Sequence, residues 1–379
     1  MSAVSDCFEP SPQAEHVATI TVEIALAARR NSQSMPTFRP NPIPLDDGAR
    51  LQRFLYEHAG ESVRIAPGQY VLANGIILPA GTRVDAFGAT LTISTTETGV
   101  DLNSHSAWRG GTIRSFQREP RAQAHSCFQA GHYWDGFYIN DFSVEDVDLE
   151  AVGVNSSGIA IYSGSNNGTV TGVTHGDSNS LENVIQLHWG CDGDPTLGTF
   201  HPHNIGIRNV KVGKLTNSPE RPNTEACPIF LSGCYNVTVD NVDIEECRTA
   251  ITYLTGDFGF LHSGLKGPLG GVSIRGVTSQ LCSTHGVIIT NYCIGHETIS
   301  AGCVRISDCS LFGHGNGNGV DGIYLDRCEN ALFDHNVISG FPVGIAVSEP
   351  VVNVKFKSTI FQHLINGIGG PFPGVEILP

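Results

Sequence analysis

Apolar and polar residues alternate in short runs along most of this 379-residue chain. One pattern returns: an apolar residue, any residue, an apolar residue, two turn-forming residues and a further apolar residue. Its middle apolar position recurs every 23 to 37 residues, at Ile139, Val170, Ile207, Val239, Ile274, Ile306, Phe333 and Phe356. A second apolar run follows each copy, from GIAIYSG (158–164) to GIAVSE (344–349). Alternating strands at such a period indicate a solenoid, in which each repeat stacks on the next.

Turn-forming residues separate the strands within each repeat. Asp141, Asn209, Asn241 and Asp308 recur at this place, where short polar side chains bond the neighbouring backbone. Two or three short strands per repeat predict a single-stranded parallel β-helix, whose successive coils stack about 4.8 Å apart. A β-sandwich with coincidental strand spacing is the alternative. Eight copies with two registered strands each argue against it.

The segment before the repeats predicts a cap. DDGARLQRFLYEHAG (46–60) has the pattern of a short amphipathic helix, and strands with Pro-Gly turns follow over 62–93. This entry, with the pattern PGxY at 67–70, resembles that of the pectate-lyase-like superfamily of right-handed parallel β-helices, over about 46 to 370. The resemblance implies an all-β, right-handed parallel β-helix with an N-terminal helical cap. It selects no reaction, because the superfamily includes lyases, hydrolases, epimerases and phage tailspikes.

Two parts of the chain are expected. Residues 45–379 form the β-helix domain. Residues 1–44, with a helix at 14–30, are an N-terminal extension that serves as a cap or as a contact in a homo-oligomer.

Composition narrows the partners and the compartment. The net charge of −15 disfavours nucleic acid, and no apolar run is long enough to span a membrane. The start, MSAVSDCFEPSP, lacks the basic and apolar regions of a secretion signal, and the eleven cysteines include no CxxC pair. We therefore expect a cytoplasmic protein with unpaired core cysteines, with a secreted mature form as the alternative.

The second strand of each repeat places alternate residues inside and outside the coil. The inward column is apolar: Ile161, Leu187, Leu231, Tyr253, Ile289, Leu325 and Val347. The outward column reads Tyr162, His188, Ser232, Leu254, Thr290, Asp326 and Ser348. His188 is therefore expected beside a solvent groove.

Candidate chemistry gathers in QLHWGCDGDPTLGTFHPHN (186–204). If the loops after the second strands leave one edge of the coil, the long loops 189–204 and 256–271 flank a short turn and form a notch. Asp192 and Asp194 then stand on one wall and Asp257 on the other, about 10 Å apart at the backbone. This layout suits the carboxylate pair of a retaining or an inverting glycosidase. We expect these aspartates, with His188 as an alternative base, to be catalytic. The alternative is that Asp192 and Asp194 only shape a turn.

Aromatic and imidazole groups close to these aspartates suggest substrate contacts. Trp189 is expected as an exposed sugar platform, with core packing as its alternative, the role expected of Trp108 and Trp134. Further candidates for binding substrate are His201, His203, Tyr235, Tyr324 and Asp326. His188, His201 and His203 could hold a divalent metal together with Asp192 or Asp194. The spacing H-x12-H-x-H matches no established motif, so no cofactor is expected.

The first strands of the repeats give a second outward column: Asn140, Thr171, Arg208, Asp240, Arg275, Ser307, Asp334 and Lys357. Charges of opposite sign alternate at Arg208, Asp240 and Arg275. One interpretation is a surface ion ladder of small energetic worth. The other is that Arg208 or Arg275 binds a substrate carboxylate, as a uronate lyase or epimerase requires.

These features together predict a carbohydrate-active enzyme with an oligo- or polysaccharide in a lateral groove of the β-helix. Cleavage of a glycosidic bond by carboxylate acid/base catalysis is the favoured reaction, and the acidic surface favours a neutral glycan. One alternative is a polysaccharide lyase or uronate epimerase that uses arginine, a metal, and His188 or Tyr235 as base. Others are a non-catalytic, tailspike-like glycan-binding module and an intracellular isomerase or cyclase.

Overall fold

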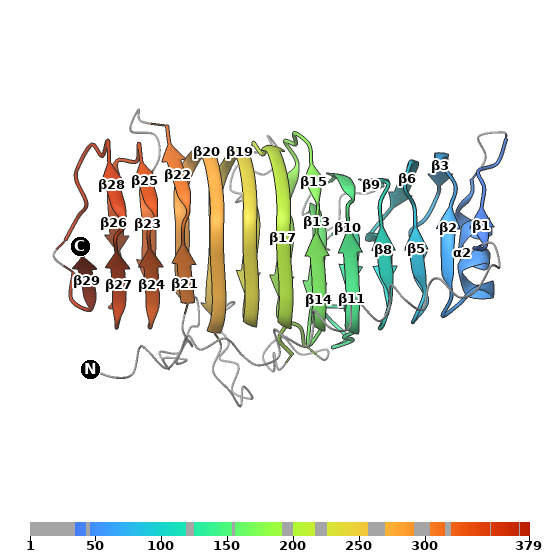
Figure 1. Ribbon diagram of the computed structural model, residues 1–379, viewed down its shortest axis with the longest axis horizontal. Coiled ribbons are helices and arrows are strands. Elements are labelled where there is room, and N and C mark those ends of the chain that lie inside the picture. Colours follow the sequence, from blue (N-terminus) through green and yellow to red (C-terminus); the bar gives the residue numbers. More distant parts are fainter. Residues whose placement is uncertain are drawn as a thin grey trace. The chain divides into compact units, whose positions relative to one another are not determined.

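The computed structural model describes residues 35–42, 46–118, 125–153, 156–191, 200–216, 226–256, 270–291, 304–314, 320–348, 350–370 and 372–379. Residues Thr37–Pro379 form one compact unit of stacked coils, and the named strands pair in parallel along it (Figure 1). In chain order the elements are β1 (Thr37–Phe38), α2 (Gly48–Glu57), β2 (Ser62–Ile65), β3 (Gly68–Leu72), β4 (Ile76–Ile77), β5 (Arg83–Asp85), β6 (Ala89–Thr95), β7 (Thr98–Leu102), β8 (Ala107–Arg109), β9 (Thr112–Gln117), β10 (His125–Ala130), β11 (Asn140–Glu145), β12 (Asp148–Val152), β13 (Ser156–Tyr162), β14 (Asn166–Thr171), β15 (Thr174–His175), β16 (Leu181–His188), β17 (His203–Lys214), β18 (Cys227–Ser232), β19 (Tyr235–Gly256), β20 (Gly270–Asn291), β21 (Val304–Ser307), β22 (Ser310–Gly313), β23 (Asp321–Asp326), β24 (Ala331–Asp334), β25 (Val337–Ser339), β26 (Val343–Val347), β27 (Val354–Lys357), β28 (Ile360–Gln362) and β29 (Val375–Leu378).

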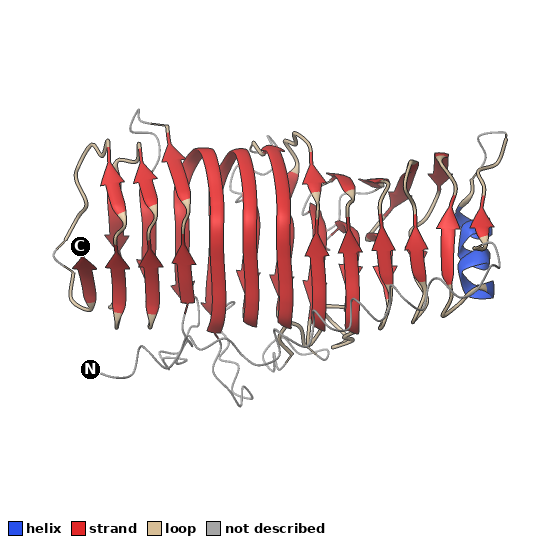
Figure 2. Ribbon diagram, in the orientation of Figure 1, coloured by secondary structure: helices blue, strands red, loops and turns tan. Residues whose placement is uncertain are grey.

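The helix α2 lies at the N-terminal end of this unit, as the sequence predicts (Figure 2). It buries Leu51 and Leu55, while the Gln52 amide exchanges two hydrogen bonds with the backbone of Ile77, at 2.9 and 2.7 Å. Those bonds satisfy backbone groups at the end of the sheet, where an open edge would otherwise invite pairing with another chain. Strand β1 pairs with β2 and precedes residue 45, the predicted start of the β-helix domain. Among the described residues no helix is long and apolar enough to cross a membrane.

Two series of sharp corners flank the first strand of each repeat, five residues apart in each coil. Each corner residue has a positive φ, which glycine, asparagine and aspartate tolerate best. One series contains His105, Asp141, Asn167, Asn204, Asn236, Gly271, Asn330 and Asn353. The other contains Gly110, Asp146, Gly172, Asn209, Asn241, Gly276, Asp308, His335 and Ser358. Asparagines at successive corners bond each other, as Asn241 Nδ2 does to Asn209 Oδ1 at 2.8 Å.

The register of the first strands agrees with the predicted outward column from Thr171 to Lys357. The first predicted copy is wrong by five residues: Val144, not Ile139, pairs with Val170, so Glu145 rather than Asn140 lies beside Thr171. The two corner series explain the error. Asp141 belongs to the corner before the strand, and it was aligned with residues of the corner after it.

The second strands build the core side that the sequence predicts. The seven inward residues pair in register from Ile161 to Val347, and all except Val347 are buried. The outward column is less open than predicted, since most of its members are also buried. The described cysteines are free thiols and are buried.

Candidate functional site

A groove of about 740 Å³ runs over the outward face of the second strands, from β4 to β16. Its floor is one registered column in which Ile77, Asp101, Gln129 and Gln186 line the groove, with Ala160 between the two glutamines. Thr98 Oγ1 donates to Gln129 Oε1 at 2.7 Å, and Ser157 Oγ donates to Gln186 Oε1 at 2.9 Å. Each glutamine amide also carries an NH2 group, which is the kind of donor that a ligand hydroxyl can accept from.

One wall of the groove is the loop 131–139, which connects β10 to β11. Its tip carries Trp134, whose side chain is 55% exposed although it lines the groove. The Tyr133 ring supports the Trp134 ring edge-on, with centroids 4.7 Å apart. Tyr133 in turn packs 5.2 Å from the His188 ring and 5.1 Å from the Trp189 ring. The loop therefore leans from the coil of β10 across to the coil of β16.

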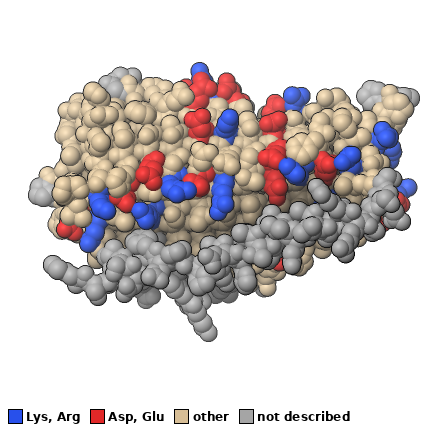
Figure 3. Space-filling view, viewed as in Figure 1, with Lys and Arg blue, Asp and Glu red and all other residues tan. Residues whose placement is uncertain are grey.

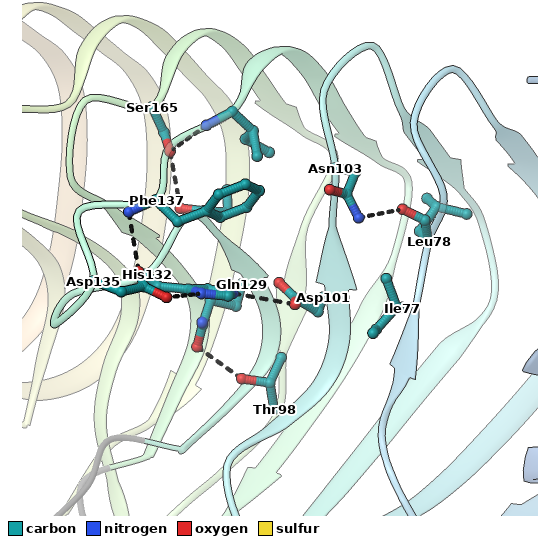
Figure 4. A network of polar contacts seen from close by, with 12 residues as sticks. Ile77, Leu78, Thr98, Asp101, Asn103, Gln129, His132, Asp135, Phe137 and Ser165 are labelled. Atoms are coloured by element: carbon teal, nitrogen blue, oxygen red, sulfur yellow. Dashed lines mark hydrogen bonds and ion pairs between the residues drawn. The ribbon is translucent and has the colours of Figure 1, made fainter.

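A charged bridge fixes the base of this loop (Figure 4). His132 Nε2 lies 3.2 Å from Asp101 Oδ2 on β7, and His132 Nδ1 lies 3.1 Å from Asp135 Oδ2. The hydrogen bond to Asp101 is the main cause that raises the pKa of His132 to about 9. Burial acts to raise the pKa of Asp135, but hydrogen bonds from the Phe137 backbone and from His132 outweigh it and lower that pKa. The ring is therefore an imidazolium between two carboxylates at neutral pH.

Two further carboxylates line the groove. Glu97 is exposed and precedes β7, and Glu182 is partly buried at the start of β16. Three coil steps separate these strands, which corresponds to about 14 Å at the backbone. No lysine or arginine is among the described residues that line this groove.

The predicted catalytic set is only partly visible. Asp192, Asp194 and Asp257 lie outside the described residues, so the predicted notch does too. His188 lies in the groove, as the sequence predicts. Its Nδ1 is 2.9 Å from the Trp189 carbonyl oxygen, and its ring stacks on Phe230 with centroids 6.2 Å apart.

The predicted roles of two tryptophans are reversed. Trp189 is fully buried and cannot be a sugar platform, whereas Trp134, expected in the core, is exposed. The reason is the loop 131–139: Tyr133 packs on Trp189, and the Cys191 backbone N–H donates to the Tyr133 carbonyl at 2.8 Å. Trp108 is buried, as predicted.

The other predicted histidines lie at a corner of the coil and do not line the groove. His201 is buried and hydrogen-bonds the Gly233 carbonyl oxygen through Nδ1. His203 stacks on Tyr235 of the next coil, with centroids 4.6 Å apart and planes at 6°. Within the part of the chain that the structure describes, no three His, Cys, Asp or Glu side chains are arranged to hold a metal ion.

The remaining binding candidates also lie away from the groove. Arg275 pairs with both oxygens of Asp240 at 3.0 Å, and Arg208 is in register with Asp240 on the coil before. These pairs fit the surface ion ladder, and Figure 3 shows acidic and basic side chains interspersed on the face drawn. Tyr324 and Asp326 belong to a separate hydrogen-bonded cluster, joined through Ser348 Oγ at 2.9 and 3.0 Å.

The sequence interpretation missed the residues that line most of the groove: Glu97, Asp101, Gln129, His132, Trp134, Asp135, Glu182 and Gln186. A signal was present in GHYWDG (131–136), which gathers His, Asp and two aromatic residues directly before the first predicted copy of the repeat. It resembles the composition of the stretch 186–204.

No family model and no curated protein matches this chain. Among solved structures, PfbA, a surface adhesin of Streptococcus pneumoniae, is 12% identical with a TM-score of 0.50 over 85% of this chain and 88% of that one. The tailspike of E. coli bacteriophage HK620, in complex with a pentasaccharide, is 12% identical with a TM-score of 0.57 over 88% and 69%. The tailspike gp49 of Acinetobacter baumannii bacteriophage Fri1, a capsular polysaccharide depolymerase, is 11% identical with a TM-score of 0.51 over 92% and 61%. With its parallel coils and this likeness in fold, the chain is a right-handed parallel β-helix, as the sequence predicts.

Proposed function

We propose that this chain binds an oligo- or polysaccharide in the groove along β7 to β16 and cleaves a glycosidic bond there. The observation that carries the proposal is the exposed Trp134 ring beside a groove floored by amides and carboxylates. A flat aromatic ring packs on the apolar face of a sugar, and amide and carboxylate groups bond its hydroxyls. The named ligand of the HK620 tailspike and the named activity of gp49 support a glycan as the partner.

Glu97 and Glu182 are the groove carboxylates that suit acid/base chemistry, because Asp101 and Asp135 both hold His132. Side chains that lean toward each other from backbones about 14 Å apart approach the roughly 6.5–9.5 Å of an inverting pair. One glutamate then protonates the leaving oxygen while the other activates a water molecule on the opposite face of the sugar. Asp192, Asp194 and Asp257 stay predicted catalytic residues of the separate notch that the sequence analysis describes.

Binding without cleavage is the second candidate. The observation that favours it is the bridge itself, in which His132 occupies both aspartates and makes them parts of a scaffold. A lyase or epimerase acting on uronates is less favoured. The described lining offers no lysine or arginine to neutralise a substrate carboxylate.

Product masses after incubation with neutral and uronate polysaccharides test the proposal. Fragments that have gained one water, formed by the wild type and lost in Glu97→Gln and Glu182→Gln, would support hydrolysis. The exposed Glu57 on α2 supplies the matched control, and Glu57→Gln should keep full activity. Unsaturated fragments would replace hydrolysis by elimination. Binding that Trp134→Ala abolishes, with no product from the wild type, would leave the binding module.

A further inference from the structure

The loop 131–139 exposes an unusual amount of aromatic surface. Trp134, Phe137 and Tyr138 are 55%, 40% and 48% exposed. Exposure of large apolar side chains to water is unfavourable, so they tend to collapse onto the nearest apolar surface unless their backbone is held. We therefore expect specific contacts to hold the backbone of this loop in place at the wall of the groove.

The base of the loop is closed on itself through His132 and Asp135. The His132 N–H donates to the Phe137 carbonyl at 2.8 Å, and the Phe137 N–H donates to Asp135 Oδ1 at 3.0 Å. The rings of His132 and Phe137 also pack, with centroids 4.9 Å apart. The His132 ring is thus built into a small closed turn that ends at the exposed aromatics.

The same ring ties this turn to the solenoid (Figure 4). Asp101 lies on β7, one coil before the loop, and its Oδ2 accepts from His132 Nε2. On the other side Ser163 Oγ donates to the His132 carbonyl, and the Cys191 N–H bonds the Tyr133 carbonyl. Hydrogen bonds therefore tie this loop, which follows β10, to the coils of β7, β13 and β16, and His132 makes the bond to β7.

We propose that His132 is the positioning residue of the groove: it fixes the loop 131–139 so that the Trp134 ring stands where a bound sugar stacks on it. This inference rests on the proposed glycan function. His132 itself touches no substrate in this role, because both of its ring nitrogens are engaged by aspartates.

The bridge requires both ring nitrogens to carry protons, since both partners are ionised carboxylates that only accept. It therefore weakens when His132 loses its proton, near pH 9. The charged and titratable groups that line the groove around the loop are Glu97, Asp101, Tyr133, Asp135, Tyr162, Glu182 and His188. The carboxylates among them favour the imidazolium form.

Tryptophan fluorescence tests the inference without a ligand. Of the three tryptophans, Trp108 and Trp189 are fully buried, so acrylamide quenching reports mainly on Trp134. We expect His132→Gln to lower the anisotropy of the quenchable emission and to leave the far-UV circular dichroism unchanged. His105→Asn is the matched control, because His105 also pairs with an aspartate, Asp141 at 3.1 Å, but away from the groove.

Glycan binding supplies the second measurement, on an array of neutral bacterial and plant oligosaccharides. We expect His132→Gln to bind about three- to tenfold more weakly, the loss of one aromatic contact, and His105→Asn to bind as the wild type. His132→Arg, which keeps a permanent cation, should recover part of the affinity. Wild-type affinity should fall through about pH 9, and Asp101→Asn should move that fall to lower pH.

The outcomes separate this inference from the proposed function. If the wild type binds and His132→Gln binds equally well with unchanged anisotropy, His132 positions nothing and the inference is overturned. An Asp101→Asn pH profile identical to that of the wild type would overturn it as well. If the wild type binds no oligosaccharide, the proposed function fails, and the sugar role of His132 falls with it. The anisotropy then still decides whether His132 holds the loop.

Discussion

Asn241 stands at a corner where the backbone must take a left-handed conformation. Its φ is +59°, and its side chain donates to Asn209 of the preceding coil at 2.8 Å. The next coil has Gly276 at the same corner, with φ +64°. A Cβ built on Gly276 would meet only the backbone of Asn241, at 3.7 and 3.8 Å, which is ordinary contact. Conformation, and not space, therefore decides what this corner accepts.

The expected effects follow from two separate costs. Asn241→Ala places an ordinary residue in the left-handed region, at about 1–2 kcal/mol, and removes a hydrogen bond worth about 0.5–1.5 kcal/mol. Asn241→Gly removes only the hydrogen bond, so glycine should be less harmful than alanine, the reverse of their order in helices and strands. Gly276→Asn should stabilise by about 0.5–1 kcal/mol, because it restricts the unfolded chain and adds a bond to Asn241.

Calorimetric melting of the full chain measures these differences. For a cooperative unit of this size, 1 kcal/mol corresponds to about 1.5 °C in Tm. The order Gly276→Asn, wild type, Asn241→Gly, Asn241→Ala is expected from highest to lowest Tm. Equal Tm values for Asn241→Gly and Asn241→Ala would refute the argument from backbone conformation. A Gly276→Asn variant less stable than the wild type would refute it independently.

Four other outcomes follow from the structure. The pKa of His132 is raised from about 6.5 to about 9, so its contribution to the free energy of unfolding is complete below about pH 6.5 and is lost as pH rises through 9. Because its side chain is 35% exposed, screening reduces the nominal contribution of about 3.4 kcal/mol to about 1–2 kcal/mol. Urea unfolding of the wild type and of His132→Gln at pH 6 and at pH 10 measures this difference. Trp189→Ala should cost about 3–5 kcal/mol in the same assay, whereas Trp134→Ala should stay within about 0.5 kcal/mol and still lose glycan binding. Arg275→Ala should change stability by less than about 1 kcal/mol, because its pair with Asp240 is exposed, and a larger loss would show that the ion ladder is structural. A chelator should leave oligosaccharide binding unchanged, and a loss restored by a divalent cation would point to a metal site beyond the described residues.

The coil could be predicted from sequence because its rules are local and repeated. Successive side chains of a strand point alternately into and out of the coil, and the seven predicted inward residues follow this rule from Ile161 to Val347. The prediction for the first copy of the repeat was wrong because each coil has two corners that accept the same residue types. Nothing in the sequence alone distinguishes Asp141 at one corner from Asp146 at the other. Strand pairing with Val170 distinguishes them.

The groove could not be predicted in the same way, because no single repeat contains it. Asp101 and His132 are 31 positions apart and meet only because β7 and β10 are neighbours. Trp189 follows the last residue of β16, where strand alternation no longer determines whether a side chain points in or out. It is buried because Tyr133, from a loop two coils earlier, packs on it. Burial by a distant loop leaves no trace in local periodicity.

The loop 131–139 leaves the solenoid after β10 and returns at β11, and the strands on both sides keep their pairing with the coils above and below. The stretch that carries the proposed sugar contact is therefore different from the stretches that build the coils. Evolution can exchange this loop for one of another length or composition while the coils beneath it stay intact. Protein engineers can do the same by grafting, provided that the new loop keeps a partner for Asp101 and an aromatic residue that covers Trp189.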